Sequence, residues 1–242
     1  MMRLKVLLTA LLISAFTEAA DPMRYGIVGQ KNWAPYFTQN EKHPGLFVEI
    51  LESVLKEAKI PAIPVRALSH TSPIAIDAGE VDVDIISPSW FKNNKIPSEY
   101  IISARIMPIV EYLVFRPEDE GKWPNKTSIV NQSVGVVENY LYHDEKSYIR
   151  QDFESEKALL LGLRDRKIDV AIVGELPFNH WTSKLDINVK IGPLHSRGYL
   201  HIRISKDYLN HLKSINRAIV ALQESGEISR IFETYNANKA NL

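Results

Sequence analysis

Apolar residues recur along the chain at two different spacings. Between Leu46 and Ala58 they return every three or four positions, which places them on one face of a helix with acidic and basic residues opposite. Around Val83–Ile86 the apolar residues are instead bunched in a short run, which is typical of a buried strand. Because segments of these two kinds alternate from Tyr25 to Tyr235, the pattern predicts an α/β protein built from βαβ units.

The same pattern, together with proline and glycine positions, predicts where individual elements lie. Strands are predicted at residues 25–28, 63–68, 83–86, 100–115, 133–137, 148–153, 169–173, 187–191 and 198–204. Helices are predicted at residues 46–58, 72–78, 154–164, 209–224 and 228–235, with a helical turn at 176–181 and a helix start near 138–140. The strand at 100–115 is expected to leave a first lobe, and the strand at 198–204 is expected to return to it.

The N-terminus has the layout of a secretory signal peptide. Arg3 and Lys5 precede an apolar stretch at residues 7–16, and small residues offer cleavage after Ala19 or Ala20. The apolar stretch is short for a membrane span, which leaves an N-terminal membrane anchor as the weaker alternative. We therefore expect export to a bacterial periplasm.

The composition limits which kinds of binding site and catalysis can be expected. The 242 residues are 45% hydrophobic and 24% charged, as in a globular protein, and a formal net charge of zero gives no reason to expect nucleic-acid binding. The absence of cysteine excludes disulfides, thiol catalysis and thiolate metal sites. The seven histidines show no metal-ligand spacing, and no nucleophile or phosphate-loop motif occurs. We therefore expect no catalytic residue, no metal site and no cofactor.

Two stretches of the chain repeat one arrangement. Residues 79–90 and 166–177 each run from a helix end through an acidic residue and an apolar strand into a polar loop with a proline. Because ligands in open α/β sheets lie beyond the carboxyl ends of the strands, both loops are candidate ligand-binding loops. The repetition predicts two similar α/β lobes that share one cleft.

The order of several short segments resembles one protein family. The segments are 33–36 (WAPY), 45–51 (GLFVEIL), 79–82 (GEVD), 134–137 (VGVV), 167–172 (KIDVAI) and the helical ending at 215–235. In this order and spacing the chain resembles the family 3 extracellular solute-binding proteins, the periplasmic components of polar amino-acid ABC transporters. The resemblance extends over nearly all of residues 25–235.

The resemblance implies a type II periplasmic binding protein fold of two lobes, each a mixed β-sheet flanked by helices. The signal peptide would occupy residues 1–20, lobe 1 would comprise residues 21–116 plus 203–242, and lobe 2 would comprise residues 117–202. The implied function is capture of a small polar, amino-acid-like solute by a monomer that delivers it to an ABC permease in the inner membrane.

The resemblance also implies roles for individual residues. An aromatic ring after the first strand, Trp33 or Tyr36, would pack over the ligand. Ser87 and Ser89 would bind its head group, and Glu175 would meet an amino group. From the residues alone, the serines are equally suited to turn hydrogen bonds and Glu175 to capping a helical turn. Trp90 is either a wall of the ligand site or a hydrophobic plug.

Two positions depart from the family pattern. The family carries an arginine after the first-lobe strand to bind the ligand carboxylate, where this chain offers lysines such as Lys95, which supply a point charge only. The family's Gly-Thr pair after the second-lobe strand is replaced here by Asn139 and Tyr140. We therefore expect weak affinity for unmodified α-amino acids.

Two other functions fit the same fold. One is a periplasmic enzyme resembling cyclohexadienyl dehydratase, in which Glu175 would act as an acid, although no acid–base pair is evident in the sequence. The other is a stand-alone sensor that presents its ligand to a membrane receptor. The sequence favours a binding protein over an enzyme.

Overall fold

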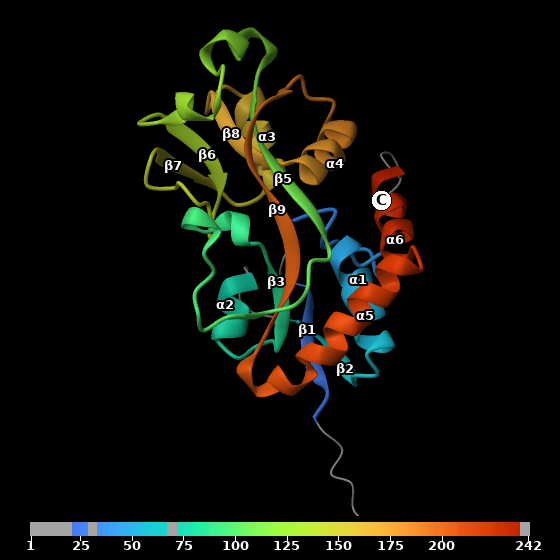
Figure 1. Cartoon of the computed structure of the whole chain (residues 1–242). Helices are drawn as coiled ribbons and strands as arrows, with labels where there is room; N and C mark the ends of the chain where they lie inside the picture. The colour runs from blue at the N-terminus through green and yellow to red at the C-terminus, as the bar shows by residue number, and fades with distance from the viewer. Residues whose placement is uncertain (1–20, 29–32, 67–71, 238–242) are drawn as a thin grey trace, which may run out of the picture.

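The computed structural model describes residues 21–28, 33–66 and 72–237, and its fold is a mixed α/β sheet flanked by helices. Within the described residues, nine strands form the sheet, in the order β2-β1-β3-β9-β5-β8-β6-β7, and β4 pairs with β9 beside this path. The chain divides around the sheet into two lobes, with β1–β3 in one and β6–β8 in the other (Figure 1).

The strands are β1 (Met23–Val28), β2 (Ala62–Arg66), β3 (Val83–Ile86), β4 (Ile101–Ile102), β5 (Met107–Phe115), β6 (Ser133–Val137), β7 (Ile149–Phe153), β8 (Val170–Gly174) and β9 (Lys190–Ile204). The α-helices are α1 (Leu46–Glu57), α2 (Ser72–Asp77), α3 (Glu156–Arg164), α4 (Glu175–Leu185), α5 (Leu212–Glu224) and α6 (Glu227–Ala237). Short 3₁₀ helices are η1 (Pro88–Trp90), η2 (Lys92–Asn94), η3 (Pro117–Lys122), η4 (Lys126–Ile129) and η5 (Lys206–His211).

Two long antiparallel strands join the lobes. β5 and β9 pair from Met107↔Leu200 to Phe115↔Lys190 and run side by side through the middle of the molecule (Figure 1). In the first lobe β1 pairs in parallel with β2 and β3, and in the second lobe β6 pairs in parallel with β7 and β8. The expected boundaries of the lobes, at residues 116, 117, 202 and 203, remain predictions.

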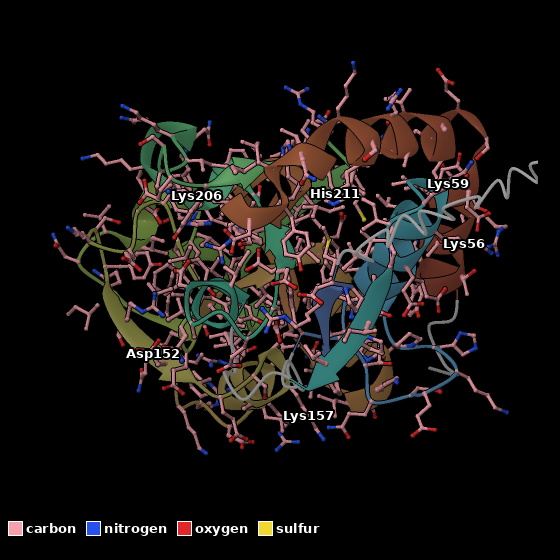
Figure 2. The ribbon with its side chains drawn as sticks, turned by 90° about the horizontal axis from the view of Figure 1, so that it is seen from below. Lys56, Lys59, Asp152, Lys157, Lys206 and His211 are labelled. Atoms are coloured by element: carbon pink, nitrogen blue, oxygen red, sulfur yellow. The ribbon has the colours of Figure 1, made fainter. Side chains whose placement is uncertain are left out.

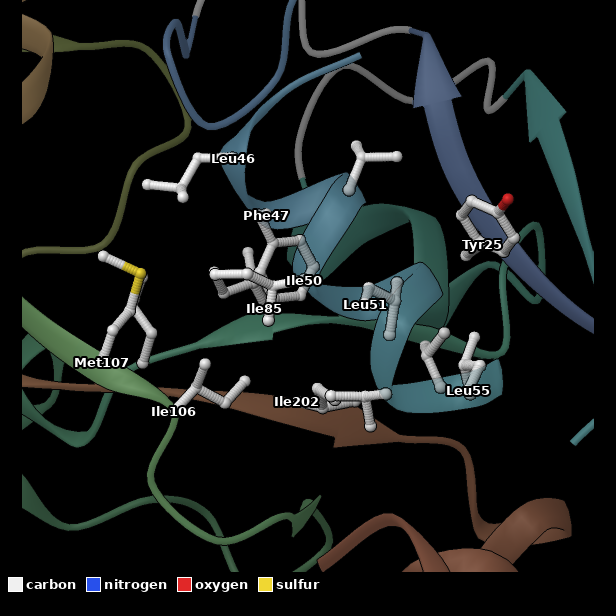
Figure 3. Packing of buried hydrophobic residues seen from close by; sticks show 14 of the residues in the cluster. Tyr25, Leu46, Phe47, Ile50, Leu51, Leu55, Ile85, Ile106, Met107 and Ile202 are labelled. Carbon is white, nitrogen blue, oxygen red and sulfur yellow. The ribbon is translucent and has the colours of Figure 1, made fainter. Parts of the chain in front are cut away.

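The first lobe has its core between the sheet and helices α1, α5 and α6. The apolar face of α1 is buried as its spacing predicts, and Ile50 and Leu51 pack towards Ile85 and Ile202 of the sheet (Figure 3). Figure 1 shows α1, α5 and α6 along one side of the sheet, with α2 on the other. The second lobe has two smaller clusters of buried residues, one on each side of its strands.

The chain between 187 and 204 differs from the two separate strands predicted there. It forms the single strand β9 from Lys190 to Ile204, and it passes through Gly192 and Pro193 without ending. Register shifts against β5 accommodate this segment, and Gly192 lies so close to the Phe115 ring that a Cβ would be 2.2 Å from its Cε1. Proline and glycine are tolerated in strands at such irregular positions.

The predicted strand at 100–115 is also different in the structure, where it is divided into β4 and β5. The residues between them form a bulge, because the Ser103 and Ile106 amides donate to Ile202 and Leu200 at 2.8 and 2.9 Å, which leaves more residues on this strand than on β9. The Ala104 amide is satisfied by Asn216 Oδ1 of α5 at 2.7 Å.

The helix start predicted near 138–140 is wrong. After β6 the chain forms turns up to β7, and Asn139 adopts φ 62°, outside the right-handed helical region. Arg150 of β7 donates to the Val137 and Tyr140 carbonyls at 3.2 and 3.1 Å, so these carbonyls have partners without a helix. The helical turn predicted at 176–181 is instead the longer helix α4.

No helix among the described residues is long and apolar enough to cross a membrane. The predicted signal peptide at residues 1–20 lies outside the described residues and stays a prediction. Charged side chains such as Lys56, Lys59 and Lys206 are exposed and extend from the outside of the ribbon (Figure 2).

Candidate functional site

Aromatic side chains from three loops meet where the two lobes approach each other. The Trp33 ring lies 4.5 Å from that of Tyr36, 5.8 Å from that of Trp90 and 5.9 Å from that of Tyr140, measured between ring centroids. Trp33 and Tyr36 precede α1, Trp90 ends η1, and Tyr140 follows β6 in the second lobe. We call these four residues the aromatic cluster.

The start of α1 holds the first-lobe part of the aromatic cluster in place. The Leu46 and Phe47 amides donate to the Pro35 and Tyr36 carbonyls at 2.9 and 3.1 Å. Gly45 has φ 131°, and a Cβ there would be 2.2 Å from the Tyr36 carbonyl oxygen. Only glycine permits both this backbone conformation and this close approach.

Ser87 and Ser89 lie just past the end of β3, as the sequence predicts, but both are buried. Their hydroxyls are 2.8 Å apart, and Ser87 Oγ also accepts from the Ser89 amide at 3.3 Å. A Cβ on Gly198 of β9 would lie 2.6 to 2.8 Å from these side chains. The two serines therefore shape η1 and the position of Trp90, and their roles as ligand residues remain proposals.

A buried carboxyl group lies behind Tyr140. Glu156 begins α3 and is 2% exposed, and its Oε1 accepts from the Tyr140 hydroxyl at 3.0 Å. Its Oε2 is buried without a hydrogen-bond partner among the described residues. Burial raises the pKa of Glu156 to about 8, so the free protein holds it mostly protonated at neutral pH.

A second buried carboxyl comes from the middle of β5. Glu111 accepts a hydrogen bond from the Ser196 hydroxyl of β9, and burial raises its pKa. Glu111, Glu156 and Glu175 all add to the effect of burial in raising the pKa of Tyr36. Three carboxyl groups therefore lie close enough to the aromatic cluster to affect it electrostatically.

The remaining predicted site residues are exposed. Glu175 is the first residue of α4, and its effect on Tyr36 places it near the aromatic cluster. Lys95 follows η2 and Asn139 lies in the loop after β6, and among the described residues neither side chain forms a hydrogen bond or ion pair with the aromatic cluster. The structure therefore brings together Trp33, Tyr36, Trp90 and Tyr140, with Glu175 nearby.

Sequence reasoning missed Glu111 and Glu156. Glu111 had a detectable signal, because it interrupts the apolar strand Met107–Phe115 with a charge. Glu156 had none, because an acidic residue in the first turn of a helix is ordinarily a solvated one. Its burial follows from the approach of Tyr140, which lies 16 residues earlier.

A further polar group consists of residues outside the aromatic cluster. His143, Asp144 and His195 each direct one potential ligand atom to a common region, and these atoms lie within 4.8 Å of one another. Among the described residues, this is the group of histidine and acidic side chains that is arranged closely enough to bind a metal ion.

Comparisons with known proteins give a clear result for structure only. A scan against protein-family models gives no match, and a search of the curated protein sequences gives none either.

Many solved structures resemble the chain over almost its whole length. The GluR0 ligand-binding core from Nostoc punctiforme in complex with L-glutamate superposes with a TM-score of 0.70 at 16% identity, covering 88% of this chain and 99% of that one. The arginine-bound substrate-binding protein AbpA of an amino acid ABC transporter from Streptococcus pneumoniae gives 0.69 at 13% identity, covering 91% and 97%.

A third similar structure is the ancestral amino acid-binding protein AncCDT-1, a precursor of cyclohexadienyl dehydratase. It gives a TM-score of 0.67 at 14% identity and covers 88% of this chain and 95% of that one. At such low identities the likeness establishes the fold and leaves the ligand open. The chain therefore has the two-lobe fold of the periplasmic binding proteins, as its resemblance to the family 3 solute-binding proteins implied.

Proposed function

We propose that the protein is a periplasmic solute-binding protein that holds a small polar solute between its lobes for ABC-type uptake. The observation that supports this proposal best is the contact between Trp33 and Tyr140, which come from different lobes and meet beside the buried carboxyl of Glu156. A small ligand bound there would touch both lobes at once. Such two-sided contact is what allows a ligand to favour a closed state.

The surroundings of the aromatic cluster favour a solute with a positively charged group. The carboxyl groups of Glu111, Glu156 and Glu175 lie near Tyr36, where a bound cation would favour their ionised forms, and aromatic faces attract cations. The free Oε2 of Glu156 can accept a hydrogen bond from an ammonium group, which would also stabilise its ionised form. Amino-acid-like compounds and amines are therefore the classes to test first.

The first prediction is that such a solute stabilises the protein against heat. In a thermal-shift panel of amino acids, amines and small organic acids, a compound at 100 times its Kd adds about 2.7 kcal/mol to the free energy of unfolding. Trp33→Ala should lower the affinity for that compound about tenfold or more, because it removes a ring that both lobes contact.

Tyr199→Ala is the matched control, because Tyr199 is an exposed aromatic residue outside the aromatic cluster. Its affinity should equal that of the wild type. Native mass spectrometry of the purified protein would identify a solute that co-purifies. The proposal fails if no compound stabilises the protein and no small molecule co-purifies, or if the two variants lose affinity equally.

One observation favours a second candidate, an enzyme resembling cyclohexadienyl dehydratase. A carboxyl whose pKa is about 8 is protonated at neutral pH and can serve as a general acid, which fits Glu156 beside the aromatic cluster. Turnover of prephenate or arogenate that is lost in Glu156→Gln would establish this function. A rate equal to the uncatalysed one would exclude it.

A further inference from the structure

His143, Asp144 and His195 form a compact group of metal-ligating side chains. His195 Nε2 lies 3.0 and 3.2 Å from the two Asp144 carboxylate oxygens, and His143 Nε2 lies 3.8 Å from Asp144 Oδ2. The two imidazole rings are 4.8 Å apart between centroids. We call these three residues the His-Asp-His group.

The fold brings this group together from two places that are 51 residues apart. His143 and Asp144 lie in the loop after β6, whereas His195 comes from the middle of β9. The β5–β9 register pairs Glu111 with Ser196 and Tyr112 with Leu194, so His195 is the extra residue of a β-bulge. Bulges re-aim side chains, and this one leaves His195 buried and in contact with Asp144.

In both histidines of the group, the ring nitrogen that does not face Asp144 lacks a hydrogen-bond partner among the described residues. His143 Nδ1 and His195 Nδ1 are buried, and neither forms a hydrogen bond with any described residue. Glu111 Oε2 lies 3.9 Å from His195 Nδ1, just beyond hydrogen-bond range. A carboxylate behind the distal nitrogen of a histidine is the usual outer partner of a metal-bound imidazole, and it fixes which nitrogen binds the metal.

We propose that the His-Asp-His group binds one divalent transition-metal ion of the Zn²⁺ type. Two imidazole nitrogens and one carboxylate oxygen are a suitable ligand set, and they leave a fourth tetrahedral position for water or another ligand. With bonds near 2.0 Å, tetrahedral ligand atoms lie about 3.3 Å apart. The atoms of the group lie within 4.8 Å, so a small movement of the half-buried His143 on its loop completes the site.

A simple ion pair explains less of this arrangement. An ion pair between Asp144 and His195 does not require His143. The His143 ring nevertheless packs against the His195 ring, and His143 Nε2 faces the same carboxylate. Metal binding would account for the position of His143, whose Nε2 would share the ion with Asp144 and His195.

The site also connects with the proposed solute-binding cleft. The loop after β6 carries Tyr140 as well as His143 and Asp144, so a bound ion would fix this loop to β9. The metal site itself requires only the His-Asp-His group. Its existence therefore does not depend on the solute-binding proposal.

Calorimetric titration with Zn²⁺ tests the site directly. The full chain, without an affinity tag and stripped of metal with a chelator, should bind one Zn²⁺ per chain, and the Co²⁺ form should show the visible absorption of tetrahedral coordination. His143→Ala should lower the Zn²⁺ affinity by more than about 100-fold, which exceeds the 10- to 100-fold cost of losing an outer partner. We choose His143 because it is half-buried on a loop, whereas His195 lies in the core.

His211→Ala is the matched control, because it removes a histidine of η5 outside the His-Asp-His group, and it should bind Zn²⁺ as tightly as the wild type. Circular dichroism verifies that His143→Ala is folded, and Asp144→Asn provides a second variant with the same expected loss. The proposal is overturned if the wild type binds no Zn²⁺, or if folded His143→Ala and Asp144→Asn bind it as tightly as the wild type.

Discussion

Glu156 is a carboxyl group withdrawn from water between Tyr140 and the first turn of α3. One of its oxygens accepts a hydrogen bond from Tyr140, and the other is buried without a described partner. An ionised carboxylate in this position lacks the solvation that water would give it, which is why its pKa rises to about 8. The residue therefore links the stability of the second lobe to pH.

We predict that Glu156→Gln makes the stability of the protein less sensitive to a rise in pH from 5 to 8. The folded pKa of about 8 lies above the ordinary carboxyl pKa of 4.5, so the unfolded state releases its proton first as the pH rises. The contribution of Glu156 to stability is thus full below pH 4.5, falls between 4.5 and 8, and stays low above 8. The loss is on the order of a few kcal/mol.

Urea unfolding at pH 5 and pH 8 measures this effect. Glutamine keeps an acceptor for Tyr140 and cannot ionise, so the variant should lose less stability between the two pH values than the wild type. Glu138→Gln is the control, because Glu138 is exposed in the same lobe. Equal pH dependence in the wild type and both variants would show that Glu156 is not the group responsible.

At the scale of elements, the loop after β3 depends on a glycine of β9. Ser87 and Ser89 pack against Gly198, where no room exists for a methyl group. This contact fixes η1, which carries Trp90 into the aromatic cluster. A change in β9 can therefore affect the proposed solute-binding site without touching a residue of the aromatic cluster.

Gly198→Ala should destabilise the protein by about 1–3 kcal/mol, because the new methyl group must displace the two serines. It should also weaken binding of the stabilising solute, because Trp90 moves with η1. Gly121→Ala is the matched control, since a Cβ there meets nothing within 4 Å. Chemical unfolding and solute titration of both variants test the prediction, which is wrong if Gly198→Ala behaves like Gly121→Ala.

Elements differ in how well the sequence predicted them. The predicted helix α1 and strand β3 were confirmed. The apolar spacing of α1 matches a helix with one buried face, and the apolar run of β3 matches a strand that is buried along its whole length. β9 was predicted as two strands, because glycine and proline normally end a strand. Its continuity is a property of the pairing with β5, which local propensity does not contain.

At the scale of the whole molecule, β5 and β9 are the strands that pass from one lobe to the other. The aromatic cluster brings Tyr140 of the second lobe against Trp33 of the first, so these rings contact each other where a solute is expected to bind. Solute binding and lobe closure should therefore be coupled. A ligand can shift such an equilibrium only by as much as it prefers one state.

We predict that the stabilising solute changes the average separation of the lobes. Small-angle X-ray scattering should show a smaller radius of gyration with saturating solute than without it, because contacts on both lobes favour the closed state. Trp33→Ala should need more solute for the same change, and Tyr199→Ala should respond as the wild type does. An unchanged radius of gyration at a saturating, stabilising concentration would contradict lobe closure.

The sequence by itself determined the α/β class, most of the elements and the two strand-end loops, because these depend on local apolar spacing and on turn residues. Its resemblance to solute-binding proteins also led to the correct fold and directed attention to Trp33 and Tyr36. The loop sequences added Trp90 and Tyr140, and the structure brings all four together.

Only the tertiary structure decided which polar groups are buried beside them. Glu111 and Glu156 became buried carboxyls, and His143 and Asp144 met His195, through contacts between residues far apart in the chain. Burial and long-range proximity are set by how strands pair and lobes pack, and no spacing rule along a single sequence records them.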